Sequence, residues 1–76
     1  METAYLIARY RTVGGVRSLV GATFASAPSI TGPLEVETEV AATATAPTYH
    51  DASLALERDV RESPRLAWAR PFVLRR

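Results

Sequence analysis

With 76 residues and a mass of 8.3 kDa, the chain has room for one small hydrophobic core, which excludes a multidomain enzyme and a repeat array. Its 47% hydrophobic and 22% charged residues exclude the low-hydrophobicity, high-charge class of disordered proteins. The net charge of +1 is too small to indicate a partner, and the absence of cysteine excludes disulfides, a cysteine zinc site and a cysteine nucleophile.

We expect residues 1–76 to form a single domain of marginal stability. Size scaling predicts that burial contributes about 110 kcal/mol against about 114 kcal/mol of ordering entropy. Because neither a disulfide nor a metal is expected to add stability, a second copy of the chain or another protein is a reasonable source of further buried surface.

A cytoplasmic location is expected. Residues 1–13 contain Glu2, Arg9 and Arg11 and do not resemble a secretory signal peptide. No uninterrupted apolar run approaches the roughly 18 residues of a membrane-spanning helix, so we expect a soluble protein with no membrane contact.

Residues 3–13 are predicted to form a strand, because β-branched and aromatic residues occur there in alternation with other types. One face would carry Leu6, Ala8 and Tyr10, and the other Tyr5, Ile7, Arg9 and Arg11.

Residues 16–24 follow as a second strand, and Gly14-Gly15 between the two runs is typical of a tight hairpin, since both central residues of a type I′ turn need positive φ. The alternative is a helix over residues 16–27, because apolar side chains also recur there at helical spacing and Pro28 would end it. We favour the hairpin, because Gly21 weakens a helix and no N-cap residue precedes Val16.

A loop over residues 26–33 is indicated by two prolines and a glycine, and residues 34–45 then predict a third strand. In this strand the glutamates are expected on the solvated face, opposite a buried face. The glutamates are Glu35, Glu37 and Glu39, and the opposite face carries Leu34, Val36, Thr38 and Val40.

A helix is predicted to start after Pro47 and to run to about Glu62, with Thr48 and Asp51 at capping-box spacing. Glu57 and Arg61 are four residues apart in the favourable orientation for an ion pair. The buried face would carry Tyr49, Ala52, Leu56 and Val60, while Leu54 lies on the opposite side of the helix.

Ser63-Pro64 would end this helix, and residues 65–76 are interpreted as a last strand at a sheet edge, because Pro71 cannot donate a ladder hydrogen bond. The predicted fold class is α+β, a small and mostly antiparallel sheet in the order β-β-β-α-β with one helix packed on one face. If residues 16–27 are helical, the order becomes β-α-β-α-β.

No catalytic or metal-binding motif is apparent. His50 is the only residue of the type used for acid-base chemistry near neutrality, and Asp51 or Ser53 would have to act with it, but no local motif surrounds them. The three glutamates of the third strand are about 6.6 Å apart along one face, too far to converge on one ion. We therefore expect no enzyme activity, no cofactor and no metal, and we expect the glutamates to pair with Arg9 and Arg11 across strands.

Charge is segregated along the chain. Residues 1–34 carry three Arg and one Glu (+2), residues 35–62 two Arg and seven acids (−5), and residues 63–76 four Arg and no acid (+4). The arginines of the last segment surround Trp68, a pattern that suggests nucleic-acid binding as an alternative function.

The sequence favours a small non-catalytic protein-interaction module that binds a protein partner or assembles as a homo-oligomer. Its size and composition suit an accessory or inhibitor protein of a bacteriophage or another mobile element that binds a host protein. The candidate partner-binding residues are Leu54, Arg58, Arg65, Arg70, Arg75 and Arg76.

Overall fold

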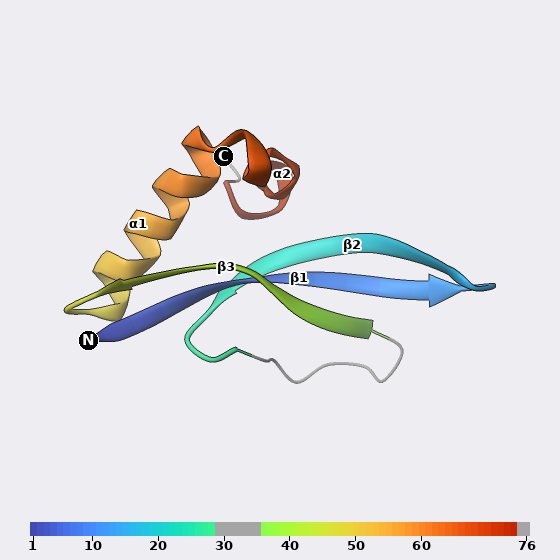
Figure 1. Ribbon diagram of the computed structural model, residues 1–76, viewed down its shortest axis with the longest axis horizontal. Coiled ribbons are helices and arrows are strands. Elements are labelled where there is room, and N and C mark those ends of the chain that lie inside the picture. Colours follow the sequence, from blue (N-terminus) through green and yellow to red (C-terminus); the bar gives the residue numbers. More distant parts are fainter. Residues whose placement is uncertain (29–35, 75–76) are drawn as a thin grey trace.

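Three antiparallel strands form the sheet on which the rest of the chain is built (Figure 1). The computed structural model describes residues 1–28 and 36–74, and its strands are β1 (Glu2–Val13), β2 (Val16–Ala25) and β3 (Val36–Ala46). The strand order is β2-β1-β3, so β1 is central. The predicted beginning of the third strand, at Leu34 and Glu35, and most of the predicted loop lie outside the described residues.

β1 and β2 form the predicted hairpin. Gly14 and Gly15 have φ values of 58° and 80°, the left-handed conformation that a type I′ turn requires at both central positions. The turn returns β2 along β1, with Val13 paired to Val16 and Leu6 to Phe24. The alternative helix over residues 16–27 is therefore wrong, since residues 16–25 form a strand that pairs with β1, whereas Gly21 would weaken a helix.

α1 (Tyr49–Glu62) confirms the predicted helix. The hydroxyl of Thr48 accepts a hydrogen bond of 3.1 Å from the Asp51 backbone N–H, which satisfies one of the free donors of the first turn. Arg61 and Glu57 form the expected ion pair at 3.4 Å.

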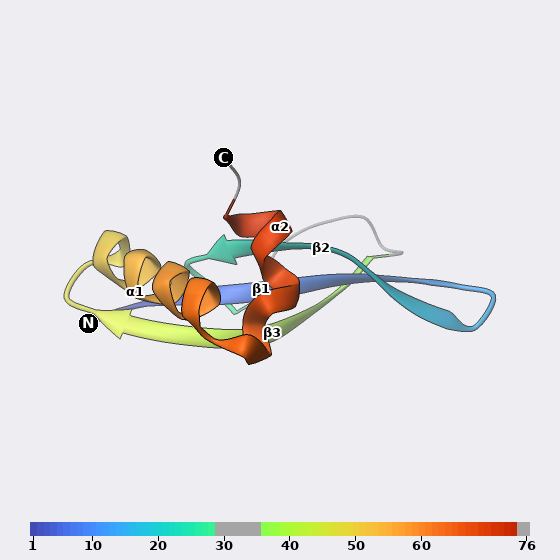
Figure 2. The same cartoon turned by 90° about the horizontal axis from the view of Figure 1, so that it is seen from above.

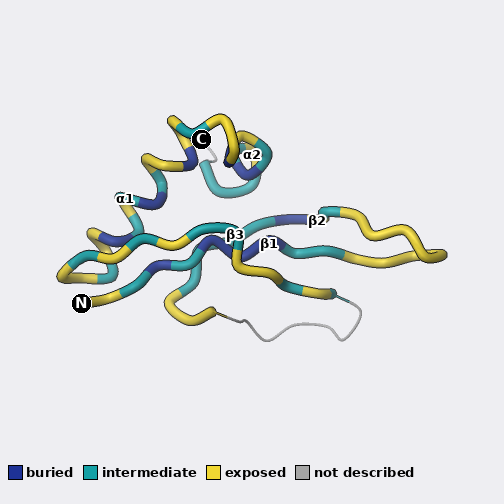
Figure 3. The backbone as a smooth tube through the Cα atoms, in the orientation of Figure 1, coloured by how far each residue is buried: buried dark blue, intermediate teal, exposed yellow. Residues whose placement is uncertain are grey.

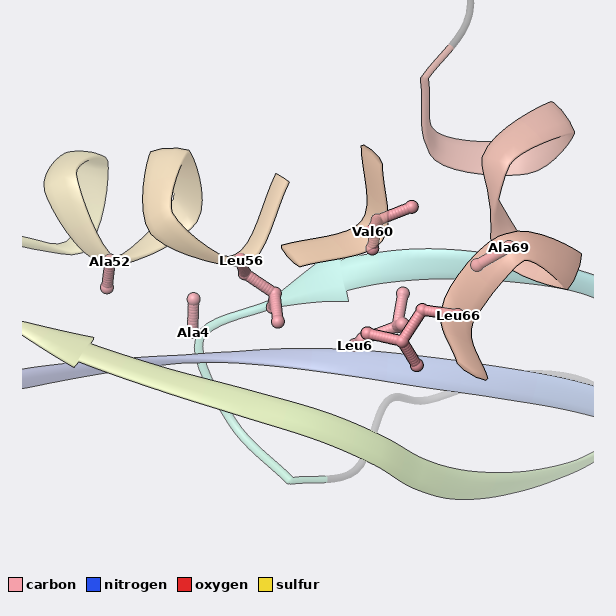
Figure 4. Close-up of a cluster of buried hydrophobic side chains, with 7 residues drawn as sticks. All are labelled: Ala4, Leu6, Ala52, Leu56, Val60, Leu66 and Ala69. Atoms are coloured by element: carbon pink, nitrogen blue, oxygen red, sulfur yellow. The ribbon is translucent and has the colours of Figure 1, made fainter. Parts of the chain in front are cut away.

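The helical segments cover one face of the sheet (Figure 2). α1 buries Ala52, Leu56 and Val60 against β1 and β3. At the start of the helix, Ala52 and Ala4 point toward each other, so that only methyl groups separate helix and strand (Figure 4). The buried core cluster consists of Ala4, Leu6, Ala52, Leu56, Val60, Leu66 and Ala69.

The C-terminal segment corrects the predicted topology. Residues 65–76 were expected as an edge strand, but the chain forms a 3₁₀ helix, η1 (Pro64–Ala69), followed by a short helix, α2 (Arg70–Val73). The α+β class and the helix-covered antiparallel sheet are confirmed, whereas the final strand of the β-β-β-α-β order is wrong. The physical reason is that Leu66 and Ala69, three residues apart, are both buried, and this spacing matches a 3₁₀ turn.

Two β-bulges decide which side chains share a face. The pairing of β1 with β3 skips Ala41, and its pairing with β2 skips Val20. Because Ala41 is inserted, Glu37 and Glu39 lie on the same face of the sheet as Ala42 and Ala44, which pack on the core. Glu37 and Glu39 are exposed, but the predicted assignment of the two faces is wrong, because the opposite face, with Val36, Thr38 and Val40, is turned away from the helices and Val40 is exposed there.

Candidate protein-interaction site

The predicted partner-binding residues occupy different environments. Leu54 is 50% exposed on the outer side of α1, and Arg58, one turn further, is exposed too. Arg65 is exposed on η1, whereas Arg70 is half-buried. Arg75 and Arg76 lie outside the described residues. The first two positions therefore share one helix face, while the third belongs to another element.

Arg70 has a structural role that the sequence did not reveal. Its Nε donates to the Val60 carbonyl at 2.8 Å, and its Nη2 donates to the Ser63 carbonyl at 3.3 Å. These carbonyls belong to the last turn of α1 and the residue after it, where backbone acceptors have no partner within the helix. The guanidinium thus fixes the turn between α1 and α2.

The alternative of nucleic-acid binding concerned the C-terminal segment. That hypothesis used an Arg-rich C-terminal strand around Trp68, and the described part of that segment is helical rather than a strand. Trp68 is half-buried and packs against the core cluster, so its ring is not a free stacking surface.

His50 lies at the exposed N-terminal end of α1, next to Asp51. Within residues 1–28 and 36–74, no hydrogen bond joins His50, Asp51 and Ser53 through their side chains, and the buried Ser53 hydroxyl has no partner. The three residues are neighbours on one helix but do not form a catalytic arrangement.

One glutamate of β3, Glu37, belongs to a charge cluster on the helix-covered face. Glu37 Oε1 lies 3.2 Å from Arg17 Nε, and the Arg17 guanidinium stacks 3.8 Å above the Tyr10 ring. The predicted pairing of glutamates with Arg9 and Arg11 does not occur among the described residues, because those arginines point to the opposite face, across from Thr38 and Val36. In the part of the chain that is described, no group of three acidic or histidine side chains is placed to hold a metal.

The tip of the β1–β2 hairpin projects beyond the helices (Figures 1 and 3). Val13 and Val16, which flank the glycine turn, are 69% and 64% exposed. They form a small apolar tip at the end of the hairpin.

A pocket lies between β2 and α2, two elements that are in contact with each other; Figure 2 shows the two elements seen from above. It has a volume of about 340 Å³ and is lined by Ala22, Thr23 and Phe24 of β2 and by Phe72 and Val73 of α2. Four of these five residues are apolar, and the fifth is Thr23. Among the described strands, β2 pairs only with β1, so its other edge is available.

Arg9 reaches the same strand from the opposite face of the sheet. It lies on β1 directly across from Gly21, and a Cβ at Gly21 would be 3.8 Å from Arg9 Nη1 and 3.9 Å from Arg9 Cδ. The arginine side chain therefore lies over the glycine and carries its guanidinium to the edge strand. Sequence reasoning placed Arg9 on the correct face but did not connect it with Gly21, because the bulge at Val20 sets that register.

Comparison of the chain with protein-family models, with curated proteins and with solved structures found no match. Over residues 1–28 and 36–74, no helix has the length and hydrophobicity needed to traverse a bilayer.

Proposed function

We propose that this protein is a non-catalytic interaction module that binds an extended segment of a partner protein along the outer edge of β2. An edge strand offers a row of main-chain donors and acceptors, and an added strand satisfies them while its alternate side chains enter neighbouring pockets. The observation that carries the proposal is the pocket between β2 and α2 beside an available strand edge.

Phe72 supports this assignment. It is half-buried and lines the pocket, whereas the described apolar residues that pack against the core cluster do not include it. An aromatic ring placed at a pocket rather than in the core is typical of binding hot spots.

The proposal carries with it the cytoplasmic location and the mobile-element accessory role expected from the sequence. The location rests on residues 1–13 not resembling a signal peptide and on the lack of a long apolar run, and the accessory role rests on size and composition. Leu54 and Arg58 are a separate surface on α1, on the far side of that helix from its buried residues.

The test is a titration of isotope-labelled protein with a capped nine-residue peptide of alternating Thr and Val, followed through backbone amide chemical shifts. We expect shifts concentrated in residues 16–25 and 70–73, because the peptide would pair with β2 and reach the pocket. Phe72→Ala should weaken binding at least about fivefold, since removal of a buried aromatic hot spot usually costs more than 1 kcal/mol.

Leu54→Ala is the matched control, because it removes an exposed apolar side chain from a different helix and should leave peptide affinity unchanged. The absence of binding at millimolar peptide, or shifts confined to α1, would contradict the proposal. Sedimentation at micromolar concentration separates it from self-assembly, since a dimer that blocks β2 would exclude the peptide.

A further inference from the structure

We infer that the partner segment is acidic and apolar in alternation, with a carboxylate recognised by Arg9 on one face of the sheet and an apolar side chain held in the β2–α2 pocket on the other. This inference rests on the proposed function, because it names the chemistry of the segment that β2 would bind.

The carboxylate position follows from the location of the Arg9 guanidinium. Its Nη1 lies 3.8 Å from the Cβ position of Gly21, on a strand whose far edge is available. Side chains directly opposite each other on neighbouring strands have Cβ atoms about 4.5–5.5 Å apart. A Glu or Asp opposite Gly21 on an added strand would therefore be within reach of this guanidinium.

Charge complementarity favours an acidic segment. Arg9 places a guanidinium over Gly21 of β2. Arg17, the only charged residue of β2 itself, lies on the opposite, helix-covered face, where it pairs with Glu37. The two ion pairs found in residues 1–28 and 36–74 join Arg17 to Glu37 and Arg61 to Glu57, so neither uses Arg9.

The requirement for an apolar side chain in the bound segment comes from the helix-covered face of the sheet, which is opposite the face with Arg9. Phe24 is paired with Leu6 on the helix-covered side, whereas Gly21 is paired with Arg9 on the other. Adjacent residues of a strand point to opposite faces. If one residue of the bound segment contacts Arg9, the next residue therefore points to the face that carries the pocket. The pocket volume of about 340 Å³ is near the lower end of ligand pockets, which suits one or two side chains.

The experiment compares three capped nine-residue peptides in which Val alternates with Glu, Thr or Lys, using fluorescence anisotropy with a dye at the peptide N-terminus. We expect the Glu peptide to bind at least about tenfold more tightly than the Lys peptide, with the Thr peptide between them. Raising the salt concentration should reduce the preference, because the contact is partly exposed to solvent.

Arg9→Gln should remove the preference for Glu over Thr while leaving the affinity of the Thr peptide within about twofold. Arg9→Lys retains the charge and should keep part of the preference. Arg11→Gln is the matched control, because Arg11 lies on the same face of β1 but across from Ser18 rather than glycine, and it should leave the preference intact.

Equal affinity for all three peptides, or an unchanged preference in Arg9→Gln, would overturn this inference while leaving β2-edge binding in place. If none of the peptides binds, the proposed function itself fails. If Arg11→Gln loses the preference for Glu and Arg9→Gln keeps it, the carboxylate is bound by Arg11 and not by Arg9. That result would also overturn this inference.

Discussion

The Arg70 side chain holds the C-terminal segment against the end of α1 through hydrogen bonds. Its two hydrogen bonds of 2.8 and 3.3 Å reach carbonyls that the helix leaves without partners. A long, charged side chain at the start of α2 thus acts as a helix C-cap from outside the helix. Its position is a consequence of the turn at Ser63 and of the 3₁₀ segment that follows.

Arg70→Ala is expected to lower the free energy of unfolding by about 1–2 kcal/mol, since charged hydrogen bonds contribute about 1.5–3 kcal/mol and this side chain is partly exposed. Urea unfolding followed by circular dichroism measures the change. Arg65→Ala, at an exposed position of η1, is the control and should change stability by less than about 0.5 kcal/mol. Equal effects of the two variants would show that the Arg70 hydrogen bonds contribute nothing.

The hairpin is the element on which the proposed binding edge depends, because β2 is held in the sheet by β1 alone among the described strands. Its turn needs two consecutive residues with positive φ, and glycine adopts this conformation without the Cβ penalty of other residues. The bulge at Val20 then shifts the register so that Gly21, and not a larger residue, lies across from Arg9.

Gly15→Ala is expected to destabilise the fold by about 1–2 kcal/mol, because its φ of 80° is costly for an L-residue. Thermal or urea unfolding measures the loss. Gly21→Ala provides the comparison, since no positive φ occurs there and a Cβ would meet Arg9 only at ordinary contact distance. A Gly15→Ala variant as stable as the parent would contradict the assigned turn.

At the scale of the whole molecule, the small core and the projecting hairpin give an extended shape. The radius of gyration is 12.8 Å, against about 11 Å expected for a compact chain of this length. The accessible surface of 5023 Å² also exceeds the roughly 4,600 Å² expected from the mass. The chain therefore buries fewer side chains than a compact chain of the same length would.

Leu56→Ala is expected to cost about 2–5 kcal/mol, because Leu56 is fully buried between α1 and the sheet. The total stability of a domain of this size is about 4–11 kcal/mol, so the variant should be partly or largely unfolded at 37 °C. Leu54→Ala, two residues away on the exposed side of the same helix, should change stability by less than about 0.5 kcal/mol. Circular dichroism melting curves compare the two, and similar losses would contradict the position assigned to the helix.

Local signals in the sequence determined the hairpin and α1. Gly14-Gly15, the alternation along β1 and the Thr48 cap each act within a few residues, so their outcome does not depend on distant parts of the chain. The partner-binding residues were less well predicted, because exposure could be inferred for Leu54 and Arg58 but not the engagement of Arg70 by α1.

Only the tertiary structure decided the helical C-terminus, the two bulges and the contact of Arg9 with Gly21. Residues 64–73 adopt helical turns because Leu66 and Ala69 complete the core that α1 has begun. The bulges belong to the pairing between two strands, so no single strand specifies them: with Ala41 skipped, Ala42 and Ala44 face the core, and Glu37 and Glu39 share that face. The pocket beside β2 forms because α2 packs against that strand, although nearly fifty residues separate the two elements in the chain. Local residue patterns do not encode such long-range packing.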